Sequence, residues 1–381
     1  MKSRNACLLL GLLCALPALA DIKVLVVSEA TARKDSHMVS RNGLEASLSK
    51  LLGQNVTVAV TDDLTDAMRS TRSAGYDVFI APAQVAASAI AHGHELIGST
   101  ASEEQYVLVA NARLHSVADI RRERIYLPQQ DSIYTYMARG LLTANGLSFK
   151  DLRNVEFARY PQAGLTAITL NLTEATVIRR EDWEAWEADN KGAAKVLATS
   201  GAVPGGFSVT ISKALAPEVR GQMSKWFTSA VPSNGLKRVA HQVDLAHYKK
   251  VAELGTFTPT SLPGATVVSA EDVKRLVSQG AVVVDTRTEK EYKAKHLAGA
   301  RFVPYVEKSL KDVAFDAALD DFSGLKSLNA AAPTIFMCNG AECWKSYKAS
   351  RAAIAARFSK VYWYRGGLPD WERSGASVDK G

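Results

Sequence analysis

The sequence is poor in cysteine and lacks any long apolar run after its first twenty residues. Only 4 of its 381 residues are cysteine. A membrane-spanning helix needs about 20 consecutive apolar residues, and no stretch beyond the amino-terminal one approaches this length. Internal repeats, Walker motifs and dinucleotide-binding glycine motifs are also absent. We therefore expect no membrane span in the mature chain and no cofactor.

Positive charge is present but is not concentrated in one place. The net charge is +7, and the basic residues are scattered rather than interleaved with aromatic side chains. An ordinary solvated surface accounts for this pattern better than a nucleic-acid-binding face, which would need a basic stripe. His92 and His94, followed by Glu95, suggest a metal site, but residues two apart on a helix do not share a face. We expect neither nucleic acid nor a metal ion as a partner.

The first twenty residues have the three parts of a secretory signal. Lys2 and Arg4 form a basic region, Leu8 to Leu13 form an apolar centre, and Ala18-Leu19-Ala20 is a small-residue cleavage motif. This pattern predicts a signal peptide at residues 1–20, cleaved after Ala20, and a periplasmic location. Two of the four cysteines leave with this segment.

The two remaining cysteines, Cys338 and Cys343, lie close together. An apolar run from Thr334 to Met337 leads into a short turn that contains Gly340, and a helix signal follows. A strand, a tight loop and a helix start place a thiol where backbone N–H groups stabilise its anion. In an oxidising compartment the pair could be a structural disulfide, but so short a loop would stabilise the fold little. A reactive or redox-gated pair is the favoured interpretation.

Two flanking segments share this arrangement of strand ends and turns. Val282 to Tyr305 begins with an apolar strand that ends in Asp-Thr-Arg, and Val361 to Trp371 is a strand that runs into a Gly-Gly turn. In this order and spacing, the three segments resemble the rhodanese domain, a sulfurtransferase module with a parallel sheet. The resemblance implies that Cys338 attacks a sulfur donor, holds the outer sulfur as a persulfide and passes it to a thiol acceptor.

The resemblance also implies roles for the residues around the nucleophile. The loop amides would face the bound sulfur, and Gly340 would permit the turn. Asp285 and Arg287 would brace the loop, while Arg365 would fix the Gly366-Gly367 turn. The expected cradle and its supports are Asn339, Gly340, Ala341, Glu342, Cys343, Trp344, Asp285, Arg287 and Arg365.

The loop departs from the usual rhodanese pattern C-R-x-G-x-[RT]. Asn339 replaces an arginine, and Glu342 adds a carboxylate that should raise the pKa of Cys338 and repel an anionic donor. Trp344 lies six positions after Cys338 where related phosphatases need arginine, which speaks against phosphatase chemistry. Cys343 takes the last loop position, from which it could attack a persulfide on Cys338 and form a disulfide.

Between residue 21 and about residue 252, strand and helix signals alternate, which is typical of parallel α/β layers. Strands are expected at Ile22–Val27, Asn55–Val60, Tyr76–Ala83 and Glu104–Asn111, and helices at His37–Leu52 and Leu64–Ser73.

This order, together with the segments Ser116–Leu147 and Leu172–Ala185, resembles a two-lobed periplasmic solute-binding protein of the phosphate or phosphonate type. The resemblance implies hinge strands near Tyr106–Asn111 and Gly206–Ile211, about which the lobes close on a ligand. The chain carries Tyr160-Pro161-Gln162 where phosphonate binders often have Ser-His. This departure speaks against a phosphonate ligand.

A ligand site can be placed at the start of one helix. Ser132 precedes an apolar helical run, so it should cap the helix and leave N–H groups facing the cleft, where an anion could bind. By the resemblance, Ser132 is the anion-binding serine and Tyr134 lies within a turn of it. Ser28 and Gln84 are further strand-end candidates. A plain helix cap is an equally good interpretation of Ser132.

The sequence therefore predicts an α/β protein: a signal peptide at 1–20, a two-lobed solute-binding domain at 21–252, a proline-containing linker at 253–265 and a rhodanese-like domain at 266–381 with a parallel sheet. The expected function is that of an exported sulfurtransferase acting through Cys338, with a small-molecule anion or solute in the amino-terminal cleft. One alternative is a solute-binding or sensing protein with an inert rhodanese scaffold, and another is a Cys338/Cys343 thiol–disulfide switch. A sulfur donor and a thiol acceptor are expected partners, and a membrane transporter or periplasmic redox partner remains open.

Overall fold

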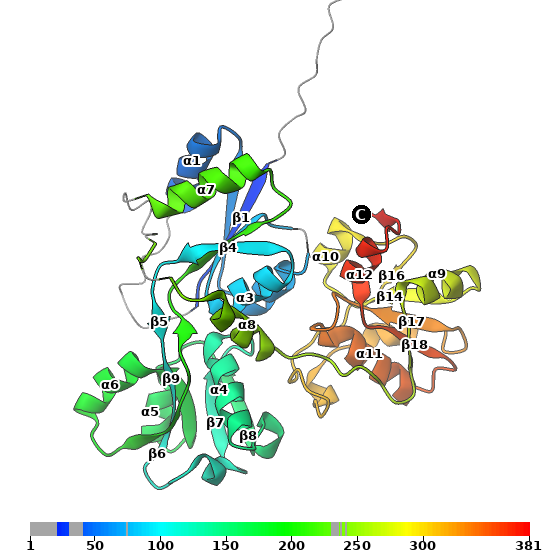
Figure 1. Ribbon diagram of the computed structural model, residues 1–381. Coiled ribbons are helices and arrows are strands. Elements are labelled where there is room, and N and C mark those ends of the chain that lie inside the picture. The colour runs from blue at the N-terminus through cyan, green and yellow to red at the C-terminus, as the bar shows by residue number, and fades with distance from the viewer. Residues whose placement is uncertain (1–20, 30–40, 74, 230–235, 237, 241) are drawn as a thin grey trace, which may run out of the picture.

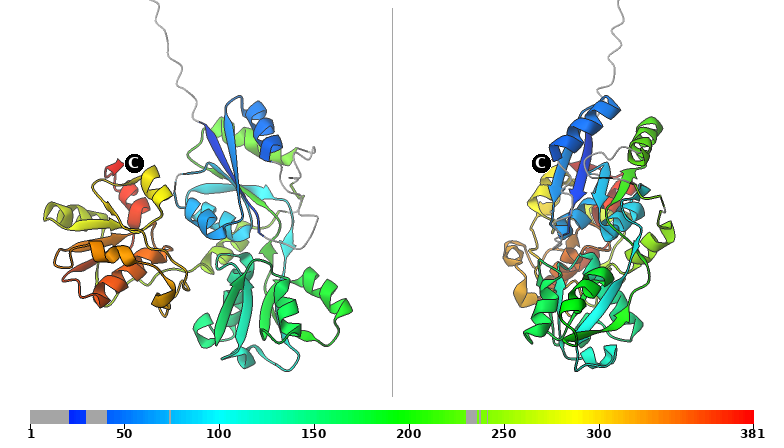
Figure 2. Two further views of the ribbon diagram at one scale, coloured as in Figure 1. Left: turned by 180° about the vertical axis from the view of Figure 1, so that it is seen from behind. Right: turned by 90° about the vertical axis from the view of Figure 1, so that its left-hand side faces the viewer.

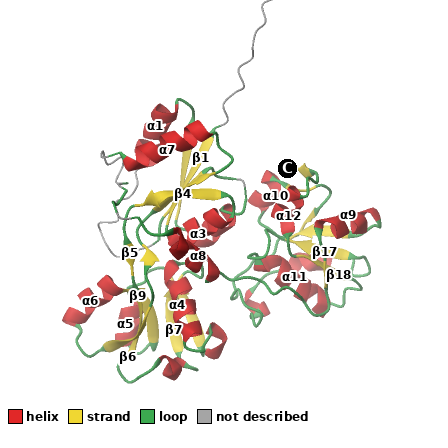
Figure 3. Cartoon of the chain, viewed as in Figure 1, coloured by secondary structure: helices red, strands yellow, loops and turns green. Residues whose placement is uncertain are grey.

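The computed structural model contains two stacked lobes and a third unit beside them (Figures 1 and 2). It describes residues 21–29, 41–73, 75–229, 236, 238–240 and 242–381. The predicted signal peptide lies outside these residues, as do positions 37–40 of the first predicted helix. Helices and strands alternate in all three units, so the fold is α/β (Figure 3).

Lobe 1 is built on a five-stranded sheet with the order β2-β1-β3-β12-β4, in which β12 is antiparallel to both of its neighbours. Its strands are β1 (Ile22–Val27), β2 (Val56–Thr61), β3 (Val78–Ala81), β4 (His94–Ser99) and β12 (Ser208–Ser212). Its helices are α1 (Arg41–Leu52), α2 (Leu64–Ser70), α3 (Ala83–Ala91) and α7 (Pro217–Thr228).

Strand β1 is apolar except at the exposed Lys23, and helices cover both of its faces. Val24 and Val26 pack in one core with α1 and α7, whereas Leu25 and Val27 pack in a second core with α2 and α3. A strand buried on both faces is a continuous apolar run rather than an alternating one. The predicted strand at Ile22–Val27 has the bounds of β1.

Lobe 2 is built on a second five-stranded sheet with the order β10-β6-β9-β7-β8. Its strands are β6 (Tyr106–Asn111), β7 (Arg124–Pro128), β8 (Asn154–Ala158), β9 (Ala175–Arg179) and β10 (Ala194–Thr199). Its helices are α4 (Ile133–Ala144), α5 (Ala163–Thr169) and α6 (Arg180–Asp189), with 3₁₀ turns η1 (Val117–Ile120) and η2 (Phe149–Asp151).

The chain crosses between the lobes twice. The crossing segments β5 (Glu103–Glu104) and β11 (Val203–Pro204) pair antiparallel with each other. They directly precede β6 and β12, the strands to which the sequence analysis assigned the hinge. After lobe 1 is complete, α8 (Leu245–Glu253) packs back on α3.

The third unit, the carboxy-terminal domain, has a sheet of order β13-β18-β17-β14-β16 in which every paired strand is parallel. Its strands are β13 (Thr266–Val267), β14 (Val282–Asp285), β16 (Arg301–Phe302), β17 (Thr334–Met337) and β18 (Val361–Tyr364), with a separate pair β15 (His296–Leu297) and β19 (Val378–Asp379). Its helices are α9 (Ala270–Ser278), α10 (Glu289–Ala294), α11 (Trp344–Ala355) and α12 (Gly367–Arg373), with 3₁₀ turns η3 (Ala317–Leu319) and η4 (Ser323–Ser327).

The central strand β17 delivers Cys338 to the edge where the parallel strands end. All four residues of β17 are buried, because helices cover both faces of the sheet. On one side, Trp363 of β18 is fully buried against α11, and its indole N–H donates to the Ser346 hydroxyl at 3.1 Å.

Replacing Trp363 by alanine should destabilise the carboxy-terminal domain by about 3–5 kcal/mol, because the change leaves a large cavity and removes the partner of Ser346. Denaturant unfolding followed by far-UV circular dichroism measures the effect. Val313→Ala is the control, since Val313 is 44% exposed and its truncation should change stability by less than about 0.5 kcal/mol. Equal shifts in the two variants would contradict this placement of the core.

Candidate functional site

The Cys loop, residues 338–343, connects β17 to α11. Cys338 follows the strand directly, and Cys343 is the N-cap residue of α11. The two side chains form a disulfide with their Cα atoms 6.1 Å apart. Both cysteines are buried, Cys338 with 1% and Cys343 with 6% of its surface exposed. The pair that the sequence brings close is therefore bonded and shielded in this structure.

The backbone of the loop is free to bind an anion. Within the described part of the chain, no acceptor receives the N–H groups of residues 339–342. Gly340 has a φ of +89°, a conformation that side-chain-bearing residues adopt only with strain. Free amides beside a sulfur atom stabilise negative charge on it, because they are already oriented and need no reorganisation.

Buried charged groups hold the loop from below. Arg287 donates to both carboxylate oxygens of Asp285, and a further N–H of its guanidinium donates to the side-chain oxygen of Asn339 at 3.3 Å. The Asn339 amide in turn donates to Glu291 of α10 at 2.6 Å. Asn339, which stands where the rhodanese pattern has arginine, is thus fixed between a cation and a carboxylate.

A glycine turn supports the loop from the side. Gly367 has a φ of +58°, and a Cβ atom at this position would lie 2.1 Å from the carbonyl oxygen of Cys338. The next amide, that of Leu368, donates to the same carbonyl at 2.9 Å. No side chain fits at residue 367, so glycine at this position is required for the close approach of the two backbones.

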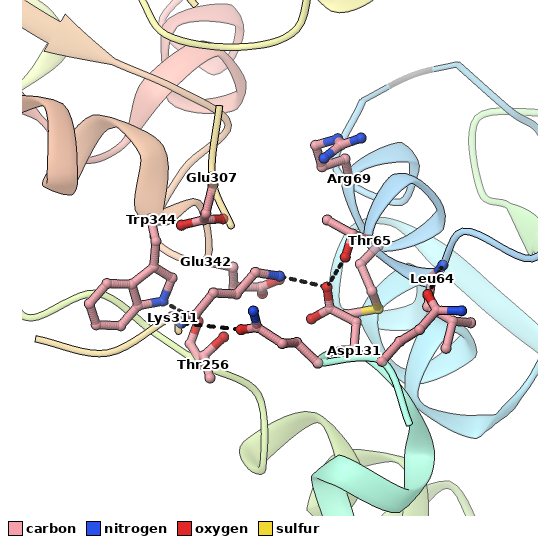
Figure 4. Close-up of polar contacts among 12 residues, drawn as sticks. Leu64, Thr65, Arg69, Asp131, Thr256, Glu307, Lys311, Glu342 and Trp344 are labelled. Atoms are coloured by element: carbon pink, nitrogen blue, oxygen red, sulfur yellow. Dashed lines mark hydrogen bonds and ion pairs between the residues drawn. The ribbon is translucent and has the colours of Figure 1, made fainter. Parts of the chain in front are cut away.

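The segment between the domains is docked on the Cys loop. The N–H and hydroxyl of Thr258 both donate to the carbonyl of Ala341, at 2.8 and 2.7 Å. Arg365 donates to the carbonyl and hydroxyl oxygens of Thr258, at 2.8 and 3.2 Å, rather than to the glycine turn next to it. Trp344 donates its indole N–H to the carbonyl of Thr256 at 3.2 Å (Figure 4). Arg365 thus acts on the loop through the linker.

Lobe 1 covers the outer side of the loop. Glu342 forms an ion pair of 2.6 Å with Arg72, and His92 lies 3.8 Å from its other oxygen. Arg69 of α2 approaches Glu291 at 3.9 Å. The negative charge that Glu342 adds to the loop therefore faces the guanidinium of Arg72 in another domain. The sequence analysis did not find these partners, since they are about 270 residues away along the chain.

In the cleft between the lobes, Ser132 caps α4 as predicted: its hydroxyl accepts from the amide of Thr135 at 3.1 Å. The first free amide of the helix, that of Ile133, donates at 2.8 Å to a carboxylate of the chain itself, Glu29 at the end of β1. The Gln84 amide donates to the same carboxylate oxygen at 2.7 Å and to the Asp131 carbonyl at 3.1 Å. The position expected to hold an anionic ligand is occupied by Glu29.

Glu29 has an unusual electrostatic environment. Burial raises its pKa to about 7, although the hydrogen bonds from Ile133 and Gln84 act in the opposite direction. The sequence analysis missed Glu29, although it directly follows the candidate Ser28 at the same strand end. Both partners of the Gln84 amide nitrogen are acceptors, which fixes the orientation of the Gln84 amide group. The Gln84 side-chain oxygen therefore points away from these partners. It is buried and has no partner among the described residues.

The other two cleft candidates have different surroundings. Tyr134 is buried, and its ring meets that of Tyr106 edge to face with centroids 5.3 Å apart. Ser28 is half-buried, and its backbone amide donates to Thr61 in the neighbouring strand. A hollow of about 440 Å³ lies where the lobes meet and is lined by Asp62, Asp63, Gln129, Phe157, Ala158 and Arg159.

The sequence predicts neither a metal site nor a membrane span, and both predictions can be compared with the described residues. Within them, no cluster of three or more histidine, cysteine or acidic side chains has the arrangement of a metal site. The helices they form are too short or too polar to cross a bilayer. Trp183 of α6 is buried, with its ring centroid 5.4 Å from that of Trp186.

Comparison with known families decides the assignment of both halves. A family model described as "ABC transporter, phosphonate, periplasmic substrate-binding protein" matches residues 30–253, more than half of the chain. The chain belongs to this family. A second model, "Rhodanese-like domain", matches residues 269–374. This phosphonate-binding-protein family member therefore carries a rhodanese-like domain after its two lobes, and the resemblances found in the sequence are confirmed.

Solved structures similar to this family member include PhnD1 from Prochlorococcus marinus (MIT 9301) in complex with methylphosphonate, with 14% identity and a TM-score of 0.47, covering 62% of this chain and 97% of that one. A binding protein component of an ABC phosphonate transporter from Pseudomonas aeruginosa has 15% identity and a TM-score of 0.40, covering 56% and 76%. The alkanesulfonate-binding protein SsuA from Xanthomonas axonopodis pv. citri, bound to MOPS, has 16% identity and a TM-score of 0.35, covering 56% and 72%. A search of curated proteins finds no match.

The raised pKa of Glu29 predicts a pH-dependent stability. Between pH 4.5 and about 7 the folded protein keeps a proton that the unfolded chain has lost, so stability should fall as the pH rises through this window. Glu29→Gln removes the effect and should be more stable than the parent above the window, by on the order of 3 kcal/mol.

Thermal unfolding across this window, and one unit beyond it on either side, measures the difference. Glu156→Gln is the matched control, because Glu156 is exposed and lies on a strand of lobe 2. If Glu29→Gln and Glu156→Gln show the same pH dependence, Glu29 is not buried in the cleft of the protein in solution.

Proposed function

We propose that this protein is an exported sulfurtransferase whose reactive group is Cys338 and whose amino-terminal lobes bind a small molecule. The observation that carries the proposal is the bond between Cys338 and Cys343 in a loop whose amides at residues 339–342 have no acceptor among the described residues. A glycine turn that fits tightly against the loop and a buried Arg287 that braces it support the same assignment. Export, with cleavage after Ala20, would place the chain where this family is described to act.

The reaction begins from the reduced pair. The Cys338 thiolate attacks the outer sulfur of a donor such as thiosulfate; the S–S bond of the donor breaks, sulfite leaves, and Cys338 carries a persulfide. The loop amides offset the charge of that persulfide. A thiol acceptor can then attack the outer sulfur and restore the Cys338 thiolate.

Cys343 provides a second way to remove the outer sulfur atom from the Cys338 persulfide. Its thiolate can attack the inner sulfur of the persulfide, so that hydrosulfide leaves and the Cys338–Cys343 disulfide forms. This is the bonded state in the structure. A dithiol reductant, such as a periplasmic redox protein, must then reduce the disulfide before another cycle. The Glu342–Arg72 ion pair lessens the repulsion that Glu342 would exert on an anionic donor.

A thiol–disulfide switch is the second candidate, and the burial of both cysteines favours it. In that case the bond itself would be the signal, and no sulfur would be carried. The two candidates differ in one intermediate: the transferase forms a persulfide on Cys338, whereas the switch does not.

For the cleft, we propose a ligand that does not compete with Glu29 for the amide of Ile133. An oxyanion would have to displace the Glu29 carboxylate or bind beside it, and ionised Glu29 repels it at neutral pH and above. A neutral or cationic small molecule with N–H donors would instead find an acceptor in the Gln84 side-chain oxygen, which has no partner among the described residues. An ABC transporter in the membrane is the partner that such a cleft would serve.

The cysteine variants separate transfer from switching. Each protein is reduced, freed of reductant, treated with thiosulfate and measured by intact-protein mass spectrometry. Cys343→Ser should gain one sulfur atom and keep it, because the resolving thiol is absent. The parent should release sulfide and lose two hydrogens as the disulfide returns, and Cys338→Ser should stay unmodified. Absence of the added sulfur from Cys343→Ser would overturn the transferase proposal and leave the switch.

The ligand proposal predicts a gain of binding on neutralising the cleft carboxylate. Glu29→Gln should bind methylphosphonate at least about tenfold more tightly than the parent at neutral pH, since a repulsive charge is removed from the helix N-terminus. Isothermal titration calorimetry measures both affinities, with Glu156→Gln as the control. Tight binding by the parent, unchanged in Glu29→Gln, would show that the oxyanion binds elsewhere.

A further inference from the structure

The carboxy-terminal domain is joined to both lobes at once, through different residues. Its Lys311 pairs with Asp131 of lobe 2, and its Glu342 pairs with Arg72 of lobe 1. Lobes that close about a hinge change their relative position, so these two contacts can coexist in only a narrow range of lobe arrangements. We propose that closure of the cleft and shielding of the Cys338–Cys343 disulfide are one coupled change, so that the cysteines become accessible when the lobes open. The inference concerns the regulation of the site proposed above.

Asp131 is the point where all three units meet. Its carboxylate, 3% exposed, accepts from the Thr65 hydroxyl of lobe 1 at 2.8 Å and from the Lys311 ammonium at 2.6 Å (Figure 4). The neighbouring Gln130 accepts from the Lys311 amide and donates to the Ser309 carbonyl, each at 3.3 Å. The segment 309–311 is therefore fixed on lobe 2 at the helix start that closes the cleft.

Helix α2 of lobe 1 links the cleft to the Cys loop. At its amino-terminal end, the Leu64 amide donates to the Gln129 side chain, and the Thr65 hydroxyl donates to the Asp131 carboxylate. This end of α2 therefore joins the two lobes. At the other end, Arg69 faces Glu291 of the carboxy-terminal domain. Arg72, just beyond the helix, pairs with Glu342 in the loop itself. A movement of α2 away from lobe 2 would break the contacts at its first turn and displace the cover from the loop.

In this arrangement three sets of contacts cover the loop around the two buried cysteines. Lobe 1 lies over Glu342, the linker covers Ala341, and Asn339 is held between Arg287 and Glu291. A ligand that favours the closed lobes would therefore protect the disulfide, and its release would expose the disulfide to a reductant or, once reduced, to a sulfur donor.

The rate of disulfide reduction tests the coupling directly. The full-length oxidised protein is exposed to dithiothreitol, and samples are alkylated and weighed at intervals. Lys311→Met keeps the aliphatic stem but loses the pair with Asp131, and we expect reduction about tenfold faster than in the parent. Lys311→Arg retains the charge and should stay slow. Lys293→Met is the matched control, because the Lys293 side chain is exposed on α10 and, among the described residues, forms an ion pair with Glu289 of the same helix alone.

The decisive variant is Thr65→Val, which has the shape of threonine but cannot donate to Asp131. Thr65 contacts Asp131 of lobe 2, and among the described residues its side chain forms no hydrogen bond to the Cys loop. A purely local cover therefore predicts an unchanged rate, whereas the coupled change predicts reduction several-fold faster. Circular dichroism melting of each variant verifies that it is folded. Parent-like rates in both Thr65→Val and Lys311→Met would overturn the proposal.

This measurement is independent of sulfur transfer. Reduction of the disulfide needs no persulfide, so an accelerated rate in Thr65→Val stands even if Cys343→Ser fails to accept sulfur. Conversely, persulfide formation with unchanged reduction rates would support the transferase and remove the coupling.

Discussion

The ion pair between Lys311 and Asp131 is almost fully buried where the three units meet, and the docking of the carboxy-terminal domain depends on it. Burial alone raises the pKa of Asp131, but Lys311 and the Thr65 hydroxyl outweigh that effect and hold the pKa below its usual value. A charge of this kind is costly to leave without its partner, because no solvent replaces the lost contact. The pair therefore specifies how the carboxy-terminal domain docks, and the shielding of the Cys loop follows from that docking.

Pairing of a charged group across two units also occurs at both candidate functional sites, the cleft and the Cys loop. In the cleft, the helix start that could attract an anion is satisfied by Glu29; at the Cys loop, the extra carboxylate Glu342 is satisfied by Arg72. In both places a charged side chain of one unit forms a hydrogen bond or an ion pair with a group of another unit. In this state the lobes are in contact, and the charged and polar groups of both sites pair within the protein. External ligands and reagents must therefore compete with these internal partners.

Much of the fold could be predicted from the sequence because local signals agreed with the tertiary structure. The segment Ile22–Val27, apolar except at Lys23, is a strand with both faces covered. Ser132 caps its helix, and Thr334–Met337 leads to Cys338 at the carboxyl edge of a parallel sheet. Periodicity and capping act over a few residues, so they can be found without knowing what packs against them.

The parts that could not be predicted depend on contacts between distant segments. Nothing near Glu342 indicates that Arg72 will meet it, and nothing near Arg365 indicates that its guanidinium will hold Thr258 rather than the adjacent turn. Glu29 gave a weak signal through its place after a strand end, but its pairing with Ile133 requires the lobes to be closed. Sequence reasoning therefore identified the loop and the helix start, but not the groups that occupy or cover them.

The docking of the linker changes where the structural unit that contains the rhodanese-like domain begins. The family match starts at residue 269, yet Thr256 and Thr258 supply hydrogen bonds to Trp344 and Ala341, and Arg365 is directed to the linker. A fragment cut at the match boundary would leave an indole donor, a loop carbonyl and a guanidinium unpaired around the sulfur site. The smallest piece with a native Cys loop therefore extends upstream of its own sheet, into the connection with the lobes.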